Sequence, residues 1–330
     1  MHYDVEFNSA AQLPAMGVVQ AAARADGKGF GTVWKGEANN KDPLTLLSAM
    51  AAVTKRIQLG TAVVHMFARS PVSLGIAAAT LNEMVEGRLI VGLGLANARI
   101  AAWHGLKFER PLRYIREYVE ALRRVYSGEK VDYRGELITV GEGFRLGFRP
   151  PSYPLRVYLA ALGPQMTRLA AQIADGVLIN MANPNRIRII VDRVRASARE
   201  AGRDPDTVPV LCKVRCSVNP DLQAARAQLK KIATFYSLAG GYSRMISDMG
   251  FSNEVAAIHD TWQKAGFHAA VTHVSDRMLD GLPLLPATSV QEVKERLKAY
   301  FDAGISRVIV PYVTSTEAVM DETLEFVSRW

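Results

Sequence analysis

The chain has 330 residues, 49% of them apolar, and a formal net charge of +8, so it can bury one large core. No run reaches the roughly 18 apolar residues of a membrane-spanning helix, and no signal peptide precedes the first expected strand, which predicts a cytoplasmic protein. The basic residues are spread over many expected helices without a nucleic-acid-binding motif, which argues against a nucleic-acid partner.

Cys212 and Cys216 are expected to lie on one face of a single strand, too far apart to form a disulfide. Both are expected to be core residues in a reducing compartment.

Eight short apolar runs rich in β-branched residues are expected to be strands. They are Tyr3–Phe7, Gly31–Lys35, Ile57–Val64, Arg88–Leu95, Leu155–Ala161, Gly176–Met181, Val208–Val218 and Ile305–Tyr312.

Segments with helical spacing of apolar residues fall between these strands, and several begin with proline, which is tolerated in a first helical turn. They are Ala10–Asp26, Pro43–Lys55, Pro71–Glu86, Pro111–Ser127, Pro164–Ala174, Pro184–Ala201, Leu222–Ser237, Val290–Ala303 and Glu317–Arg329. Strand followed by helix, eight times in 330 residues, predicts an α/β protein of the (β/α)8 TIM barrel type. A doubly wound open sheet is the alternative if the weakest run, Gly31–Lys35, is not a strand.

Two segments depart from a minimal barrel, although residues 1–330 are expected to form one domain. Residues 131–149 alternate and turn through glycines, which indicates a hairpin before the fifth strand. Residues 240–286 contain helical pieces broken by glycines, between the seventh and eighth strands. Such an insertion lies over the carboxyl-terminal face of the barrel, where barrel enzymes keep their sites, so it is either a substrate lid or a packed extension of the core.

The segment Leu162-Gly163-Pro164-Gln165 ends the fifth strand and opens a helix. Unpaired backbone N–H groups and the positive end of the helix then point above the barrel, where a phosphate would bind. The structural alternative is a tight turn at Gly163 followed by a helix start at Pro164.

The segment Gly92–Asn97 superficially resembles a dinucleotide-binding loop. Its sixth position is asparagine, and no acidic residue follows at the expected distance, so we reject NAD as the cofactor. Glycine at position 94 is instead expected to let a flat ring approach the backbone, with Asn97 offering its amide to a polar edge.

Two carboxylates follow neighbouring strands. Glu6 ends the first strand and Glu37 follows the second, so both reach the same rim of the barrel in apolar surroundings and are candidate catalytic groups. Arg69 is expected to pair with Glu83 or Glu86 on the next helix, with an anionic ligand as the alternative.

Several aromatic residues also fall at or after strand ends, where they could line a heterocycle pocket or simply pack in the core, which is the preferred interpretation for each alone. They are Trp34, Trp103, His104 and Tyr312.

Three longer segments resemble the luciferase-like (β/α)8 superfamily, and most closely its branch of coenzyme F420-dependent methylenetetrahydromethanopterin reductases. They are LGTAVVHMFARSPVSLGIAAATLNEMVEGRLIVGLGLAN, RPLRYIREYVEALRRVYSGE and VYLAALGPQMTRLAAQIADGVLIN. The resemblance covers essentially the whole chain and weakens from Ala224 to Pro286.

The resemblance implies a cofactor pocket at the barrel mouth, with F420 as the expected cofactor and FMN as the alternative. It implies a cis peptide between Ala62 and Val63 as a backstop for the ring, and acidic residues at the positions of Glu6 and Glu37. His65 is expected to face the pocket as a hydrogen-bond donor, with a loop residue outside the pocket as the alternative. The remaining expected cofactor contacts are Gly94, Asn97, Leu162, Gly163, Pro164, Gln165 and Asn180.

The expected function is therefore hydride transfer between F420 and an unidentified small organic substrate. Asn97 stands where the resembling reductases carry aspartate, so the tetrahydropterin substrate does not follow from the resemblance. The alternatives are an FMN-dependent monooxygenase that uses oxygen and a partner reductase, a non-catalytic flavin-binding barrel, and a flavin-free barrel that binds partners through its insertion. A homodimer is expected from the resemblance, and no metal is expected.

Overall fold

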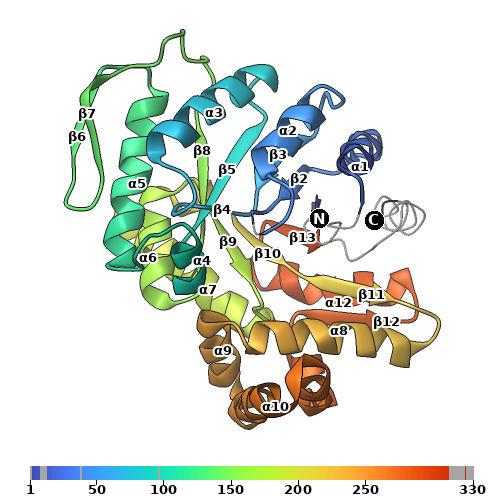
Figure 1. Cartoon of the computed structure of the whole chain (residues 1–330). Helices are drawn as coiled ribbons and strands as arrows, with labels where there is room; N and C mark the ends of the chain where they lie inside the picture. Colours follow the sequence, from blue (N-terminus) through green and yellow to red (C-terminus); the bar gives the residue numbers. More distant parts are fainter. Residues whose placement is uncertain (1, 8–12, 38, 96, 312–323, 325–330) are drawn as a thin grey trace.

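The computed structural model describes residues 2–7, 13–37, 39–95, 97–311 and 324. Eight parallel strands form its central sheet, each paired with the next around a ring (Figure 1). They are β1 (Tyr3–Glu6), β2 (Thr32–Lys35), β3 (Gln58–Thr61), β5 (Leu89–Gly94), β8 (Arg156–Ala160), β9 (Gly176–Asn180), β10 (Val210–Lys213) and β13 (Arg307–Pro311). Pairing of β13 with β1 and of β3 with β5 closes the ring. The predicted (β/α)8 barrel is confirmed, and the open sheet is excluded.

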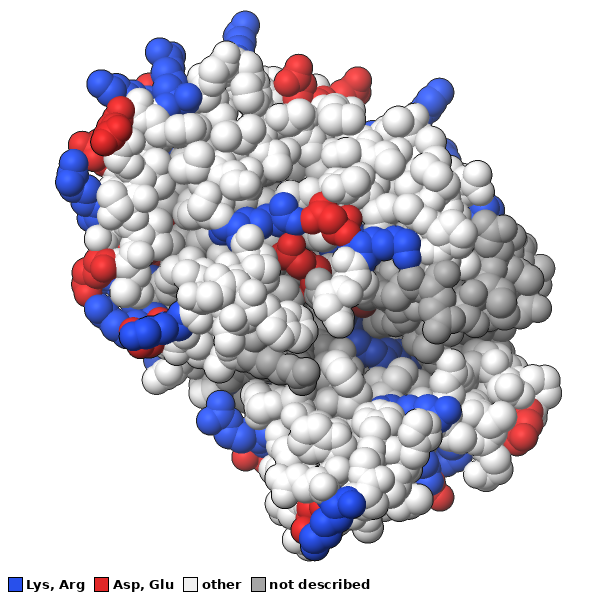
Figure 2. All heavy atoms as spheres, in the orientation of Figure 1, with Lys and Arg blue, Asp and Glu red and all other residues white. Residues whose placement is uncertain are grey.

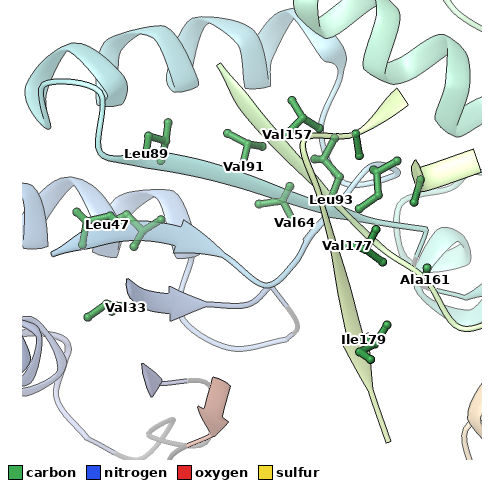
Figure 3. Close-up of a cluster of buried hydrophobic side chains, with 14 of the residues drawn as sticks. Val33, Leu47, Val64, Leu89, Val91, Leu93, Val157, Ala161, Val177 and Ile179 are labelled. Carbon is green, nitrogen blue, oxygen red and sulfur yellow. The ribbon is translucent and has the colours of Figure 1, made fainter. Parts of the chain in front are cut away.

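Side chains alternate between the barrel interior and the surrounding helices, as the two-residue period of a strand requires. The inward-facing cluster consists of Trp34, Ala62, Ile90, Leu178, Leu211 and Ile309. Their neighbours along the strands pack outward under the helices; Figure 3 shows part of this outer core, including Val33, Val91, Val157, Val177 and Ile179. The interior is thus filled, and ligands have access only to its ends.

Among the described residues, eight helices surround the barrel, and five of them begin with proline as predicted. They are α1 (Ala15–Gly27), α2 (Pro43–Ala51), α3 (Pro71–Met84), α5 (Pro111–Tyr126), α6 (Pro164–Ile173), α7 (Pro184–Glu200), α8 (Leu222–Ser237) and α12 (Val290–Asp302). The helix predicted over Glu317–Arg329 lies outside the described residues. No helix in the described ranges has both the length and the apolar character to cross a membrane.

Two predicted strands are broken. The first ends as β3 at Thr61, and after a cis peptide between Ala62 and Val63 the chain resumes as β4 (Val64–His65). The second divides into β10 and β11 (Arg215–Val218), and β11 leaves the barrel to pair with β12 (Leu284–Ala287), a strand that the sequence analysis missed. Cys212 and Cys216 therefore lie on different strands, which corrects the expectation of a shared face; both are free thiols.

Residues 131–149 contain β6 (Val131–Arg134) and β7 (Thr139–Phe144), which pair antiparallel beside α5. The turn between them is fixed by the buried carboxylate of Glu117 on α5, which accepts hydrogen bonds from the backbone N–H groups of Glu136, Leu137 and Ile138. A short helix that was not predicted, α4 (Ala98–Trp103), follows β5, and a 3-10 turn (Pro205–Thr207) precedes β10.

Residues 240–286 pack beneath α8 in Figure 1. They form α9 (Gly240–Ile246), a π-helical turn (Ser247–Phe251), α10 (Ser252–Ala270), a 3-10 turn (Val271–His273), α11 (Asp276–Gly281) and β12. The helical pieces change direction at Gly250 and Gly266, which both have positive φ. These elements share a hydrophobic cluster with α8 that is distinct from the barrel cores and includes Leu229, Ile246, Phe251, Ile258 and Leu279.

The backbone of β5 approaches β3 so closely that position 92 admits only glycine. A Cβ there would lie 1.9 Å from the carbonyl oxygen of Thr61. We expect Gly92→Ala to lower the free energy of unfolding by about 2 kcal/mol or more, because the overpacked strands must separate. Gly27→Ala is the control, since a Cβ at position 27 meets nothing within 4 Å. Equal urea midpoints for the two variants would contradict this expectation.

Candidate active site

Two buried charges meet at the carboxyl-terminal mouth of the barrel. Glu6 and Lys213 each lie two residues beyond an inward-facing residue, Asp4 and Leu211, so both point into the barrel. The Nζ atom of Lys213 donates to Oε1 of Glu6 at 2.5 Å and to the carbonyl oxygen of Ala62 at 2.7 Å. Lys213 was missed by the sequence analysis, although its position two residues after Leu211 was the signal that could have found it.

Glu37 fixes the loop that carries the cis peptide. Its Oε2 accepts the backbone N–H of His65 at 2.8 Å, its Oε1 accepts Nη2 of Arg69 at 3.0 Å, and its own backbone N–H donates to the carbonyl of Val63 at 2.8 Å. Arg69 also pairs with Asp42. The expected pairing of Arg69 with Glu83 or Glu86 is therefore wrong. The carboxylates after β2 are nearer to this arginine and fix its guanidinium from two sides.

His65 lies against this loop with both ring nitrogens buried and, in the part of the chain that the structure describes, without a hydrogen-bond partner. The side chain is 9% exposed, and burial lowers the pKa of the imidazole despite the nearby charge of Glu37. A neutral ring with unsatisfied nitrogens is suited to bind a ligand's polar edge, because an unpaired buried polar group is unfavourable.

Lys35 adds a second buried ammonium at the end of β2. It donates to the carbonyl of Gly36 at 2.9 Å and to Oδ1 of Asn40 at 3.1 Å. Burial lowers the pKa of Lys35 to about 8, while the charge of Glu6 opposes this shift.

Asn180 connects the mouth to residues 222–246. Its Nδ2 donates to the hydroxyl of Tyr242 at 3.0 Å, and its Oδ1 accepts Nη1 of Arg215 at 2.9 Å. Arg215 also donates to the hydroxyl of Tyr236 at 2.5 Å, and its guanidinium stacks 4.8 Å from the centre of that ring.

Met181, which follows Asn180, is fully buried and has a left-handed backbone conformation (φ 56°), which is uncommon for a residue other than glycine. Arg215, Tyr236 and Tyr242 carried no sequence signal, since only tertiary packing brings them to Asn180.

The start of α6 is open toward solvent. Gly163 is its N-cap and has no side-chain cap; Pro164 and Gln165 are exposed, and nothing lies within 4 Å of a Cβ at position 163. Arg186 lies alongside, with Nη2 3.4 Å from the carbonyl oxygen of Leu162. Its Nε is buried and has no hydrogen-bond partner within the described ranges, and burial lowers the pKa of the guanidinium.

The glycines of β5 have a different neighbour from the expected ring. A Cβ at Gly94 would lie 2.5 Å from Cγ2 of Val63, so these glycines make room for the cis-peptide segment itself. Asn97 is exposed and caps α4, accepting the backbone N–H of Ile100 through Oδ1 at 3.1 Å.

The aromatic candidates do not form one wall. Trp34 is fully buried in the barrel interior and donates from Nε1 to Asp4 at 2.9 Å, so it is a core residue. Trp103 and His104 are exposed, and Tyr312 lies outside the described residues. Within the described ranges, no group of three His, Cys, Asp or Glu side chains could hold a metal ion.

Figure 2 shows a hollow across one face of the molecule, along which basic and acidic side chains meet. Taken together, the structure brings Glu6, Ala62 and Lys213 into contact, links Glu37 to the backbone of His65, and joins Asn180 to α8 and α9 through Tyr236, Tyr242 and Arg215. Such a site can orient a polar heterocycle over a charged floor.

The lowered pKa of His65 predicts a pH dependence of stability. Because the unfolded state binds a proton more readily near the ordinary histidine pKa of 6.5, stability is retained above this value and lost as the pH falls through it. In urea titrations, His65→Gln should lose less stability than the wild type between about pH 7.5 and 5.5, since glutamine does not titrate. Exposed His268→Gln is the control, because His268 is not among the groups that shift the pKa of His65. An identical pH dependence in wild type and His65→Gln would refute the burial effect.

Comparison with known proteins places this geometry in a family. The chain is 30% identical over 299 residues to the 5,10-methylenetetrahydromethanopterin reductase of Methanolobus tindarius, covering 90% of each chain. It is 26% identical over 328 residues to a putative coenzyme F420-dependent oxidoreductase of Mycobacterium tuberculosis, covering 93% of this chain and 94% of the relative. The structure of the coenzyme F420-dependent tetrahydromethanopterin reductase of Methanopyrus kandleri superposes with a TM-score of 0.86 at 23% identity, covering 99% of this chain and 97% of that one. The family model for luciferase-like monooxygenases matches residues 6–307, and the chain belongs to this family.

Proposed function

We propose that the protein is a coenzyme F420-dependent oxidoreductase that transfers a hydride between this cofactor and a small organic substrate. The relatives with matching lengths include proteins named as an F420-dependent oxidoreductase and as methylenetetrahydromethanopterin reductases. The observation that carries the proposal is the buried imidazole of His65, which has no hydrogen-bond partner among the described residues, follows the peptide Ala62–Val63 by two residues and suits the polar edge of a flat ring.

The open start of α6 suits the cofactor's phosphate. Backbone N–H groups in the first turn of a helix have no partner within the helix, and the positive helix end favours an anion. Leu162, Gly163, Pro164 and Gln165 form this turn, and the guanidinium of Arg186 adds a positive charge beside it.

Coenzyme F420, when bound, supplies or accepts the hydride. In this proposal, Val63 supports the ring from the barrel side with Gly94 packed behind it, and His65 and Asn180 fix the orientation of the ring. Glu6 and Glu37 remain the proposed catalytic carboxylates. Their contacts favour a holding role, because Glu37 uses both oxygens on His65 and Arg69, while Glu6 pairs with Lys213.

The substrate of the relatives is not carried over. Asn97 caps α4 in this chain, and an amide cannot exchange a proton as the aspartate expected from the resemblance would. We propose only that a small organic molecule binds above the ring, with residues 240–286 as its lid.

The second candidate is an FMN-dependent monooxygenase supplied by a partner flavin reductase, which the monooxygenases of the matched family favour. The non-catalytic flavin-binding barrel, the third candidate, would share the cofactor contacts. We further propose a single-domain chain that acts in the cytoplasm as a homodimer.

Titration of the purified protein with F420 and with FMN, followed by fluorescence quenching, distinguishes the candidates. Micromolar affinity for F420 with negligible affinity for FMN supports the first proposal. The reverse preference supports the second, and binding of neither refutes any flavin role.

Gly163→Asp tests the phosphate position. An aspartate fits the open space and can cap α6, so the fold should be retained, but its charge would repel the phosphate. We expect F420 affinity to fall by at least about tenfold, equivalent to about 1.4 kcal/mol. Gly163→Asn is the matched control, because asparagine caps equally well without the charge. Equal affinities of these two folded variants would place the phosphate elsewhere.

A further inference from the structure

The ion pair between Glu6 and Lys213 forms the floor of the barrel mouth. We call Glu6, Lys213 and the Ala62 carbonyl the floor bridge. Lys213 ends β10, Glu6 ends β1, and Ala62 follows β3, so the lysine spans the mouth above the apolar interior. This bridge ties the cis-peptide segment to the opposite side of the barrel.

The two charged members of the floor bridge differ in access. The side chain of Glu6 is 1% exposed, whereas that of Lys213 is 12% exposed. A lysine ammonium has three N–H donors, and Lys213 uses one on Glu6 and one on Ala62. No further acceptor among the described residues takes a hydrogen bond from its third N–H. The group that a ligand can reach is therefore the ammonium, not the carboxylate.

The charges around the floor bridge indicate the kind of atom that would accept this hydrogen bond. Arg215 is 7% exposed and has only neutral acceptors, Asn180, Tyr236 and the sulfur of Met181, in the described part of the chain. Lys35 is 2% exposed and lies within electrostatic range of Lys213 and Glu6. Lys213 thus has a second ammonium, Lys35, within electrostatic range, and the buried Arg215 at the same mouth has no anionic acceptor in the described part of the chain, which favours an oxygen or nitrogen carrying negative charge.

We propose that Lys213 is the ligand-contacting group of the floor and donates its third N–H to an electron-rich oxygen or nitrogen of the bound ring, with Glu6 as its fixed counter-ion. This assignment rests on the proposed flavin-type cofactor. It gives Glu6 a positioning role, in which Glu6 acts through the orientation of Lys213. The alternative is that the pair only balances buried charge.

Four variants separate these roles, with F420 affinity measured by fluorescence quenching and melting temperature measured without cofactor. Lys213→Met should weaken F420 binding by about tenfold or more, because it removes a charged donor. Glu6→Gln should weaken binding by no more than about threefold, since glutamine still offers an acceptor to Lys213. Lys213→Arg should likewise stay within about threefold, because the cation and its donors remain.

The double variant Glu6→Gln/Lys213→Met is decisive. Lys213→Met alone should melt earlier because it removes the cation paired with the buried Glu6 carboxylate, and the double variant should recover much of this loss. Its F420 affinity should remain as weak as that of Lys213→Met. Recovered affinity in the double variant would reduce the pair to charge balance and overturn the proposal. Wild-type affinity of Lys213→Met, or Lys213→Arg as weak as Lys213→Met, would also overturn it.

Lys264→Met is the matched control. Lys264 is 72% exposed and pairs with Asp260 within α10, so this variant should keep wild-type affinity and melting temperature. These measurements distinguish a failure of the proposed F420 function from a failure of the role proposed for Lys213. If the wild type binds FMN and not F420, the same variants are titrated with FMN. If the wild type binds neither, the ligand role is refuted, while the melting temperatures still report the ion pair.

Discussion

The closed parallel barrel constrains every polar group of the candidate site. In a barrel of this size, inward side chains fill the interior, so a polar side chain that points inward is tolerated where the packed layers end. Trp34 and Leu211 close the interior. Lys213 lies two residues beyond Leu211 and ends β10. Glu6 ends β1, and β13 lies between these two strands. Along each strand every second side chain points into the barrel, and the packed core fixes which ones do. The last inward-pointing residues of β1 and β10 are Glu6 and Lys213, so the mouth carries charge.

Both carboxylates at this mouth are held by cations. Glu6 lies against Lys213, and Glu37 lies between Arg69 and a backbone N–H group. A carboxylate whose oxygens accept hydrogen bonds in this way is suited to fix a loop or a cation. The sequence marks Glu6 and Glu37 as candidate catalytic groups at one rim. Their contacts also make them a scaffold for the cis-peptide loop and for a lysine.

The strand and helix order was predictable because each element carries its own periodicity and turn residues. The breaks within two of the strands were not predictable. No local sequence feature marks the cis peptide that follows Thr61 or the point after Lys213 where the chain leaves the barrel. The ion-pair partners of the charged residues could not be predicted from the sequence either. The ion pair of Arg69 with Glu37 joins residues 32 apart, and that of Lys213 with Glu6 joins residues 207 apart. Position Gly163 was predictable because a helix start is a local feature, whereas the neighbours of Gly94 depend on how two strands meet.

The mouth has two halves that are built on different parts of the chain, and residues 222–246 belong to the second half. Asn180 belongs to a barrel strand, yet its two amide atoms bind Tyr242 of α9 and Arg215 of β11. Arg215 in turn holds Tyr236 of α8. One half of the mouth, from Glu6 to His65, is thus built on the early strands and is tied to the barrel core. The other half depends on helices with a separate hydrophobic cluster. Substitutions within that cluster can reshape the space above the ring while the floor stays in place, which is a physical basis for one barrel to keep its cofactor and change its substrate.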